Sequence, residues 1–218
     1  MINNLNILLP EVFFTLSIFS ILMLGVFVKN SFNLIFNLSS LIIVITIAII
    51  LNRPNIEEKI FLDSFTRDAF SNFFKVLILV SSLFVLNTSK NYIKDKKLDK
   101  FEYPIIILLS ILGMFFMISS NDIIIFYLGL ELQSLSLYIL ASIDRDNLKS
   151  SESGIKYFIL SALSSGLLLY GCSLLYGFTG STNFDVISNE FSKENTGAVF
   201  AMVFILVGLA FKISAVPF

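Results

Sequence analysis

The sequence predicts an all-α polytopic membrane protein with about seven transmembrane helices. The first observation is its composition, since the 218 residues are 56% hydrophobic and 14% charged, with a mean hydropathy of +0.87. Soluble domains are nearer half apolar and a quarter charged. The second observation is that the apolar residues gather in runs of roughly 20 residues, the length that crosses a hydrocarbon core. The polar loops between these runs are too short to bury a separate soluble core.

The apolar runs, taken in order, predict spans at 6–28, 32–51, 69–89, 103–120, 122–143, 153–177 and 197–216. The first run lacks the basic start and small-residue cleavage site of a signal peptide, so we expect it to span the membrane. The short links after the first and fourth runs predict antiparallel neighbours. The segment RPNIEEKIFLDSFTRD is amphipathic and is predicted to lie at the interface, whereas STNFDVISNEFSKENTG is predicted to be a polar loop.

Lysine and arginine in the short loops predict the orientation, because cytoplasmic loops carry the excess of these residues. We expect the loops after the odd-numbered spans to face the cytoplasm or the mitochondrial matrix, and the amino terminus to lie on the periplasmic or intermembrane side. The cations of the odd-numbered loops are Lys29, Lys90, Lys94, Lys96, Lys97, Lys100, Arg145 and Lys149, and those of the other side are Arg53, Lys59, Arg67 and Lys193.

Several functions are disfavoured by what the chain contains. Its net charge of −1 gives no reason to expect a nucleic-acid partner. It has no histidine, so neither an imidazole metal site nor an imidazole proton relay is expected. The single cysteine, Cys172, lies in an apolar run and is expected to be a small packing residue.

Glu131 is the first candidate functional residue, because it lies about 13 Å into the fifth span when measured from Asp122 at ~1.5 Å per residue. A charge at the centre of a membrane helix costs about 2.5–3.5 kcal/mol on insertion scales, and such residues are usually functional. Helical spacing places Tyr127, Ser134 and Tyr138 on the same face as Glu131. These polar side chains favour the interpretation that Glu131 accepts protons in a hydrated interior. The alternative is that Glu131 is a structural anchor between helices.

Lys212 is the second candidate, about 20 Å along the last span when measured from Val199. Gly208 leaves room one turn earlier, and Pro217 would break a helix that continued. Broken membrane helices recur at ion sites, which favours a functional lysine. The alternative is a lysine that reaches the interface beyond a helix that simply ends. A desolvated lysine tends to release its proton and a nearby carboxylate opposes the release, so an acid and a base on two helices can act as a switch.

Lys156 lies near the start of the sixth span, and its position fits two interpretations equally well. It is either a proton relay or a lysine at the membrane surface. Farther along that span, the hydroxyls of Ser161, Ser164 and Ser165 either line a water path or assist close helix packing. Glu11 and Lys75 lie near the ends of their spans and are expected at the interface.

Three motifs carry a family resemblance: LGLELQSLSLYIL around Glu131, SGIKYFILSALSSGLLLYG around Lys156 and VGLAFKISAVPF around Lys212. In this order they resemble successive signatures of the antiporter-like subunits of respiratory complex I, the NADH:quinone oxidoreductase. The motifs run from the fourth span to the end of the chain, and the first three spans fit the family's topology. The resemblance implies three amino-terminal helices in 1–101 and, in 102–218, the first part of a proton-channel repeat.

The resemblance also implies roles for these residues. Glu131 would exchange a proton and modulate the pathway, Lys212 would be the central carrier, and Lys156 would relay between them or toward the matrix side. The lining of the proton channel would include Tyr127, Ser134, Tyr138, Ser161 and Ser164. The family continues beyond Val-Pro-Phe with a His-x-Trp motif and further spans, so the chain is expected to be the amino-terminal half of an inverted-repeat protein.

Partners and cofactors follow from the same resemblance. The chain would be a proton-translocating subunit of an NADH:quinone oxidoreductase in a bacterial inner membrane, or alternatively a mitochondrial one. We expect no redox centre in this chain, with FMN and iron–sulfur clusters in partner subunits and NADH and quinone as substrates of the complex. Its partners would be the lipid bilayer and other membrane subunits of complex I, including other antiporter-like subunits. Two other functions stay open: a subunit of a multi-subunit cation/proton antiporter, and a purely structural membrane subunit.

Overall fold

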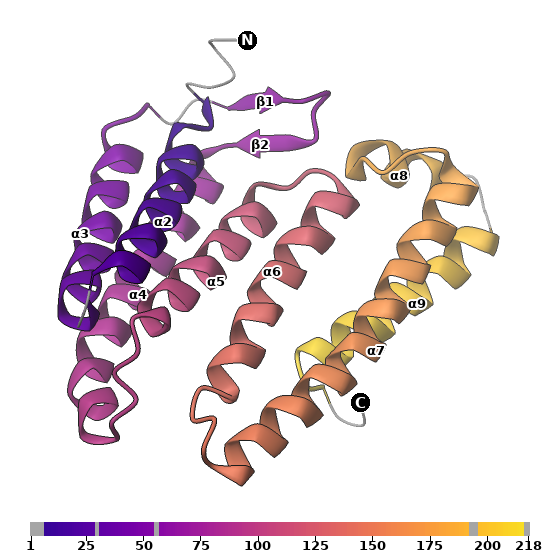
Figure 1. Ribbon diagram of the computed structural model, residues 1–218. Coiled ribbons are helices and arrows are strands. Elements are labelled where there is room, and N and C mark those ends of the chain that lie inside the picture. Colours follow the sequence, from indigo (N-terminus) through magenta and orange to yellow (C-terminus); the bar gives the residue numbers. More distant parts are fainter. Residues whose placement is uncertain (1–6, 29–30, 55–56, 192–195, 216–218) are drawn as a thin grey trace.

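A computed structural model describes residues 7–28, 31–54, 57–191 and 196–215, which are mostly helical (Figure 1). The long helices follow from apolar runs with few interior breaks, and a short hairpin and a short helix lie between them. In chain order the elements are α2 (Leu9–Phe27), α3 (Phe32–Leu51), β1 (Glu58–Ile60), β2 (Phe65–Arg67), α4 (Ala69–Asp95), α5 (Glu102–Ser119), α6 (Ile123–Ala141), α7 (Leu148–Thr179), α8 (Phe184–Phe191) and α9 (Thr196–Lys212).

Within the described residues, six helices, α2 to α7, are long and apolar enough to cross a membrane. These six confirm the first six predicted spans. The seventh predicted span corresponds to α9, which has 17 residues and ends at Lys212. Residues 216–218, and with them the predicted helix break at Pro217, lie outside the described residues, as do Lys29 and Lys193 of the predicted loops.

Polar side chains cap the starts of α4, α6 and α7. The Asp68 carboxylate accepts from Ser71 N–H in a capping box at α4, and Asn147 caps α7. At α6, the Asp122 carboxylate accepts from the N–H groups of Ile124 and Ile125. These bonds satisfy backbone donors that a helix start leaves unpaired. Since Asp122 begins α6, this cap also sets the height of Glu131 along the helix.

The segment predicted to lie at the interface forms a β-hairpin. Strands β1 and β2 pair antiparallel, and Ile60 and Phe65 beside the turn are buried. Pairing satisfies the backbone of a segment that would otherwise need water. The segment predicted to be a polar loop also contains structure, because α8 forms there and buries Ile187.

The helices pack around two hydrophobic clusters. One joins α2, α3, α4 and α5, and the other joins α6, α7, α8 and α9. Figure 1 shows α6 between the first group and the neighbouring helices α7 and α9. The groups meet where Gly113 of α5 faces Gly129 of α6, and a Cβ on Gly113 would lie 2.6 Å from Gly129 O. Only glycine permits backbones to approach this closely.

The expectation that Glu11 and Lys75 lie at the interface with water is wrong for their side chains. Both side chains are 3% exposed, and Lys75 Nζ lies 2.5 Å from Glu11 Oε1 inside the first cluster. Each residue lies near the end of its helix, but the side chain of each points into the bundle. A position near the end of a helix therefore does not place the side chain in contact with solvent.

Candidate functional site

The two charges with the deepest predicted positions form an ion pair. Lys212 Nζ of α9 lies 2.5 Å from Glu131 Oε1 of α6. Their side chains are 8% and 21% exposed, respectively. Charge-assisted bonds of this kind are stronger than neutral hydrogen bonds, because opposite charges attract more strongly away from water.

Two serines complete the polar surroundings of the pair. Ser165 Oγ of α7 donates to Glu131 Oε1 over 2.6 Å, so the same carboxylate oxygen accepts from an ammonium and from a hydroxyl. Lys212 Nζ also lies 3.3 Å from Ser134 Oγ. The pair is therefore held by three helices, and a proton that leaves Lys212 has hydroxyl groups within hydrogen-bond reach.

Close helix packing sets the distance between the two charged side chains. Gly208 lies one turn before Lys212 on α9, and a Cβ there would lie 2.7 Å from Leu168 Cβ of α7. One turn farther along α7, a Cβ on Gly171 would lie 2.9 Å from Ala201 O of α9. The room predicted beside Gly208 is thus filled by α7, and the glycines bring α9 close enough for Lys212 to reach α6.

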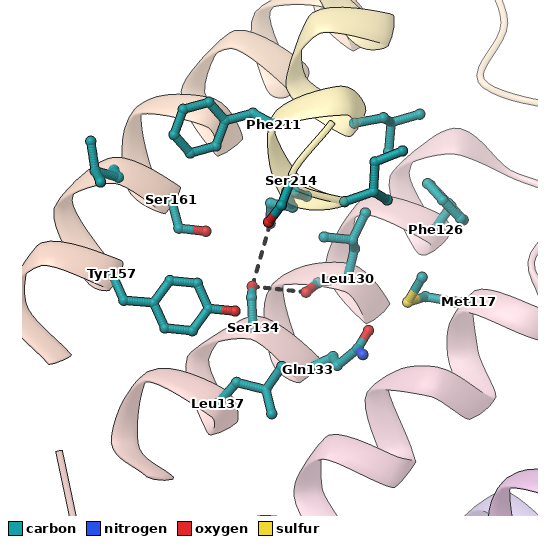
Figure 2. A pocket seen from close by; sticks show the side chains of 14 residues that line it. Met117, Phe126, Leu130, Gln133, Ser134, Leu137, Tyr157, Ser161, Phe211 and Ser214 are labelled. Atoms are coloured by element: carbon teal, nitrogen blue, oxygen red, sulfur yellow. Dashed lines mark hydrogen bonds between the residues drawn. The ribbon is translucent and has the colours of Figure 1, made fainter. Parts of the chain in front are cut away.

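A cavity of about 510 Å³ lies beside the ion pair, between α5, α6, α7 and α9. Figure 2 shows Ser134, Tyr157 and Ser161 around this space, with Met117 and Phe126 on its far side. Polar groups that converge on an otherwise apolar cavity are typical of a functional site. The lining residues are Met117, Phe126, Leu130, Gln133, Ser134, Leu137, Tyr157, Leu160, Ser161, Leu209, Phe211, Lys212, Ile213 and Ser214.

Comparisons with known proteins agree with the motifs. The family described as "NADH:quinone oxidoreductase/Mrp antiporter, TM" matches residues 120–218. NADH-quinone oxidoreductase subunit N of Pelagibacter ubique is 57% identical over 99% of this chain and 46% of its own length. The subunit N of Bartonella bacilliformis is 48% identical over 100% of this chain and 45% of its own. Over residues 120–218 the chain is thus similar to the antiporter-like subunits that this family describes. It spans about half the length of the curated relatives it matches.

Chains of solved structures share the fold. A chain of respiratory complex I from Thermus thermophilus matches with a TM-score of 0.80 and 25% identity, over 96% of this chain and 45% of that one. A chain of the Mrp complex from Dietzia matches with a TM-score of 0.74 and 21% identity, over 98% of this chain and 42% of that one. The second match supports the fold alone. Within the family, the three motifs most resemble subunit N, which is also the name of both curated relatives.

The other predicted site residues differ in their positions. Ser134 and Ser161 line the cavity, and Tyr138 donates a short hydrogen bond to Ser161. Ser164 is fully buried, and its hydroxyl has no hydrogen-bond partner among the described residues. Tyr127 packs against the second hydrophobic cluster. Of the polar residues predicted to share the face of Glu131 on α6, Ser134 therefore lines the cavity, whereas Tyr127 does not.

Lys156 is not brought to the ion pair. Its Nζ lies 2.5 Å from Glu152 Oε1 one turn earlier on α7, and both side chains are mostly exposed. Its neighbour Tyr157 does line the cavity. The structure thus places Lys156 at the outer edge of the site, next to the residue that enters it.

Sequence reasoning gave Ser165 no role of its own, although its hydroxyl binds Glu131 directly. The available signal was its spacing, because Ser161 and Ser165 are one helical turn apart and share a face. Tyr157 and Gln133 were also missed. Nothing in an apolar run indicates which of its polar residues face a neighbouring helix.

Proposed function

We propose that this chain is part of a proton-translocating membrane subunit of an NADH:quinone oxidoreductase. The observation that carries the proposal is the Glu131–Lys212 pair, which joins α6 to α9 beside a partly polar cavity. Intramembrane acids and bases that pair with one another mark proton relays. The subunit N relatives support the choice of complex, since they are 57% and 48% identical.

The proposed mechanism uses the ion pair as a switch. While Lys212 contacts Glu131, Coulomb attraction favours the ammonium form of the lysine. When the two separate in a desolvated site, the ammonium loses this support and releases its proton. The Glu131 carboxylate keeps the hydrogen bond from Ser165, and Ser134 lies within reach of the proton that leaves Lys212. Separation of the charges thus drives proton release, and their return allows reloading.

Lys156 is proposed to relay protons between the pair and the matrix or cytoplasmic side. Its pairing with Glu152 is exposed, and such pairs contribute only about 0–1 kcal/mol, so the lysine is free to change partners. The adjacent Tyr157 lines the cavity. Tyr157 and Ser161 are one turn apart on the face of α7 that lines the cavity, so a proton from Lys156 would enter this face at Tyr157.

The electron-transfer groups are proposed to belong to other subunits. NADH and quinone would react elsewhere in the complex, where FMN and iron–sulfur clusters would be held. The partners of this chain would be other membrane subunits, including antiporter-like ones. We place it as a multi-pass protein in a bacterial inner membrane, with the amino terminus on the periplasmic side by the excess of cations in the odd-numbered loops.

The test exchanges Glu131→Gln and Lys212→Met in the complete subunit within its assembled complex. We expect proton transport coupled to NADH oxidation to fall at least about tenfold in each variant, because each variant loses one proton-transfer group. Glu57→Gln and Lys90→Met are matched controls outside the pair. Full transport by assembled E131Q and K212M variants would mean that the pair is structural and the proposal is wrong.

A second candidate is a subunit of a cation/proton antiporter. It is favoured by the matched family, whose description names both the oxidoreductase and the Mrp antiporter. Transport measurements in membrane vesicles distinguish the two candidate functions. An oxidoreductase subunit gives proton transport that follows NADH oxidation, whereas an antiporter gives proton exchange that requires an added cation and needs no NADH.

A further inference from the structure

A second ion pair lies among helices α2 to α5, apart from the proposed site. Lys75 Nζ of α4 and Glu11 Oε1 of α2 are 2.5 Å apart, and the two residues have a sequence separation of 64. Both side chains are 3% exposed, so this pair is more buried than Glu131–Lys212. It lies in the core of α2 to α5, beside Phe115 of α5.

Stability does not explain this second pair. Desolvation of two charges offsets their attraction, and apolar residues of similar volume are often as stabilising or more so. The surrounding helices are rich in such residues, including Phe14 and Leu79, which are fully buried. An ionisable pair kept in these surroundings therefore points to function.

The geometry distinguishes the two partners. Lys75 Nζ lies 5.4 Å from the centroid of the Phe65 ring and 5.9 Å from that of Phe115, and both rings favour the ammonium form. The Glu11 carboxylate is bound through Oε1, whereas Oε2 is buried without a hydrogen-bond partner among the described residues. A buried oxygen in this state is costly unless a proton or a water molecule satisfies it. Glu11 is therefore the member that exchanges a proton.

Lys75 lies within one helical turn of residues that line a cavity at the start of α4. A cavity of about 230 Å³ opens between the end of α3 and the start of α4, and Asn72 and Val76 of α4, which flank Lys75, line it. Arg53 lines the same cavity. Burial and then Arg67 lower the pKa of Arg53, whereas the carboxylates of Glu11 and Glu58 oppose the lowering. Glu11 therefore faces two cations, Lys75 and Arg53, while Arg67 is paired with Glu58.

We propose that Glu11 and Lys75 form a second proton-exchange site, open to the hairpin end of the molecule through this cavity. When Lys75 Nζ moves away from Oε1, a hydronium ion entering beside Asn72 gives its proton to Oε2 of Glu11. An O–H bond forms at Oε2 and the donor becomes water. Return of Lys75 reverses the step. The site lies outside the Glu131–Lys212 pathway and does not require that this pathway conduct.

The test is infrared difference spectroscopy of the purified, complete complex during steps of pH. We expect the wild type to show a carbonyl band of a protonated carboxylic acid that shifts in D2O and is lost in E11Q. Since a lone Lys75 is costly to bury, the E11Q/K75M variant removes both charges and provides the same comparison if E11Q does not assemble. Glu58→Gln, which removes a half-exposed carboxylate at the hairpin, is the matched control and retains the band.

Loss of the band in E11Q or E11Q/K75M, with retention in E58Q, supports the site. Spectra of these Glu11 variants that superimpose on the wild type overturn it. The measurement needs no proton pumping, so its result is separate from that of the proposed function. Normal transport by E131Q would defeat the proposed function and leave this test intact.

Discussion

Lys212 Nζ lies 2.5 Å from Glu131 Oε1, although 81 positions of the chain separate the two residues. Ser165 donates to the same carboxylate oxygen from a third helix. The geometry of the pair therefore depends on how α6, α7 and α9 pack. Variants that remove one contact, or move one helix, are expected to change the pair without touching either charge.

Ser165→Ala removes the hydroxyl that donates to Glu131. A hydrogen bond to a charged group is worth about 1.5–3 kcal/mol, so we expect at least a tenfold change in the proton-transfer equilibrium at Glu131. The measurement is NADH-driven proton transport by the assembled complex across a range of pH. Ser164→Ala is the matched control, because Ser164 lies beside Ser165 and its hydroxyl has no partner among the described residues. Equal pH profiles for S165A and S164A would contradict a role for Ser165.

Gly113→Ala tests the contact that positions α6. The new Cβ would lie 2.6 Å from Gly129 O and 2.7 Å from Gln133 N, which are backbone atoms and cannot turn aside. We expect α5 and α6 to separate, with a loss of about 1–3 kcal/mol of stability. Thermal unfolding of the purified complex and the yield of assembled complex measure the effect.

Gly166→Ala is the control for this substitution, because a Cβ at Gly166 meets no atom within 4 Å. Alanine favours a helix over glycine by about 1 kcal/mol, so G166A is expected to match or exceed the wild type in stability. If G113A unfolds at the same temperature as G166A, the close contact with Gly129 does not hold α6 in place.

The sequence predicted the long helices well, because an apolar run has few other stable states in a membrane. It also indicated that Glu131 and Lys212 act together, from their opposite charges and from the family motifs. The hairpin was missed for a local reason. Its turn places Phe61, Leu62 and Asp63 at positive φ, a region that glycine favours, so the residues give no turn signal.

The buried Glu11–Lys75 pair was missed for a different reason. Each residue lies near a helix end, where a charged side chain usually reaches water. Whether it does so depends on the rotation of the helix and on what covers it. Here Phe65 of the hairpin lies over Lys75, and this contact requires the tertiary structure.

Lys156→Met separates a relay from a surface lysine. The exposed pair with Glu152 contributes about 0.3–0.5 kcal/mol, so stability is expected to stay nearly constant. If Lys156 relays protons, transport falls about tenfold or more in K156M. Glu152→Gln, which unpairs Lys156 but retains it, keeps most transport. Transport by K156M at the wild-type rate would remove Lys156 from the pathway.

The contact between the hairpin and α8 is predicted to depend on pH. The Asp185 carboxylate accepts from Asn121 Nδ2 over 3.0 Å and from Lys59 Nζ over 3.1 Å. The hydrogen bond from Asn121, followed by that from Lys59, lowers the pKa of Asp185 from its usual 3.8. The hydrogen bond with Asp185 raises the pKa of Lys59 from its usual 10.5.

The directions of the two pKa shifts define the pH range in which this contact is stable. A lowered carboxyl pKa gives stability that is present above the usual value of 3.8 and is lost as pH falls through the folded value. A raised lysine pKa gives stability that is present below 10.5 and is lost as pH rises through the folded value. The contact should therefore hold across neutral pH and open at the acid end, as pH falls below 3.8 and through the lowered pKa of Asp185.

Spin labels at exposed Leu62 of the hairpin turn and Val186 of α8, with the buried Cys172 replaced by alanine, measure this opening as a distance. We expect a narrow distance distribution across neutral pH, and a distribution that broadens as pH falls below 3.8 and through the lowered pKa of Asp185. Asp185→Asn removes the titrating carboxylate, so its distribution should no longer depend on pH at the acid end. If D185N broadens with acid as the wild type does, then another carboxylate controls the contact, and the pairing of Lys59 with Asp185 does not hold the hairpin against α8.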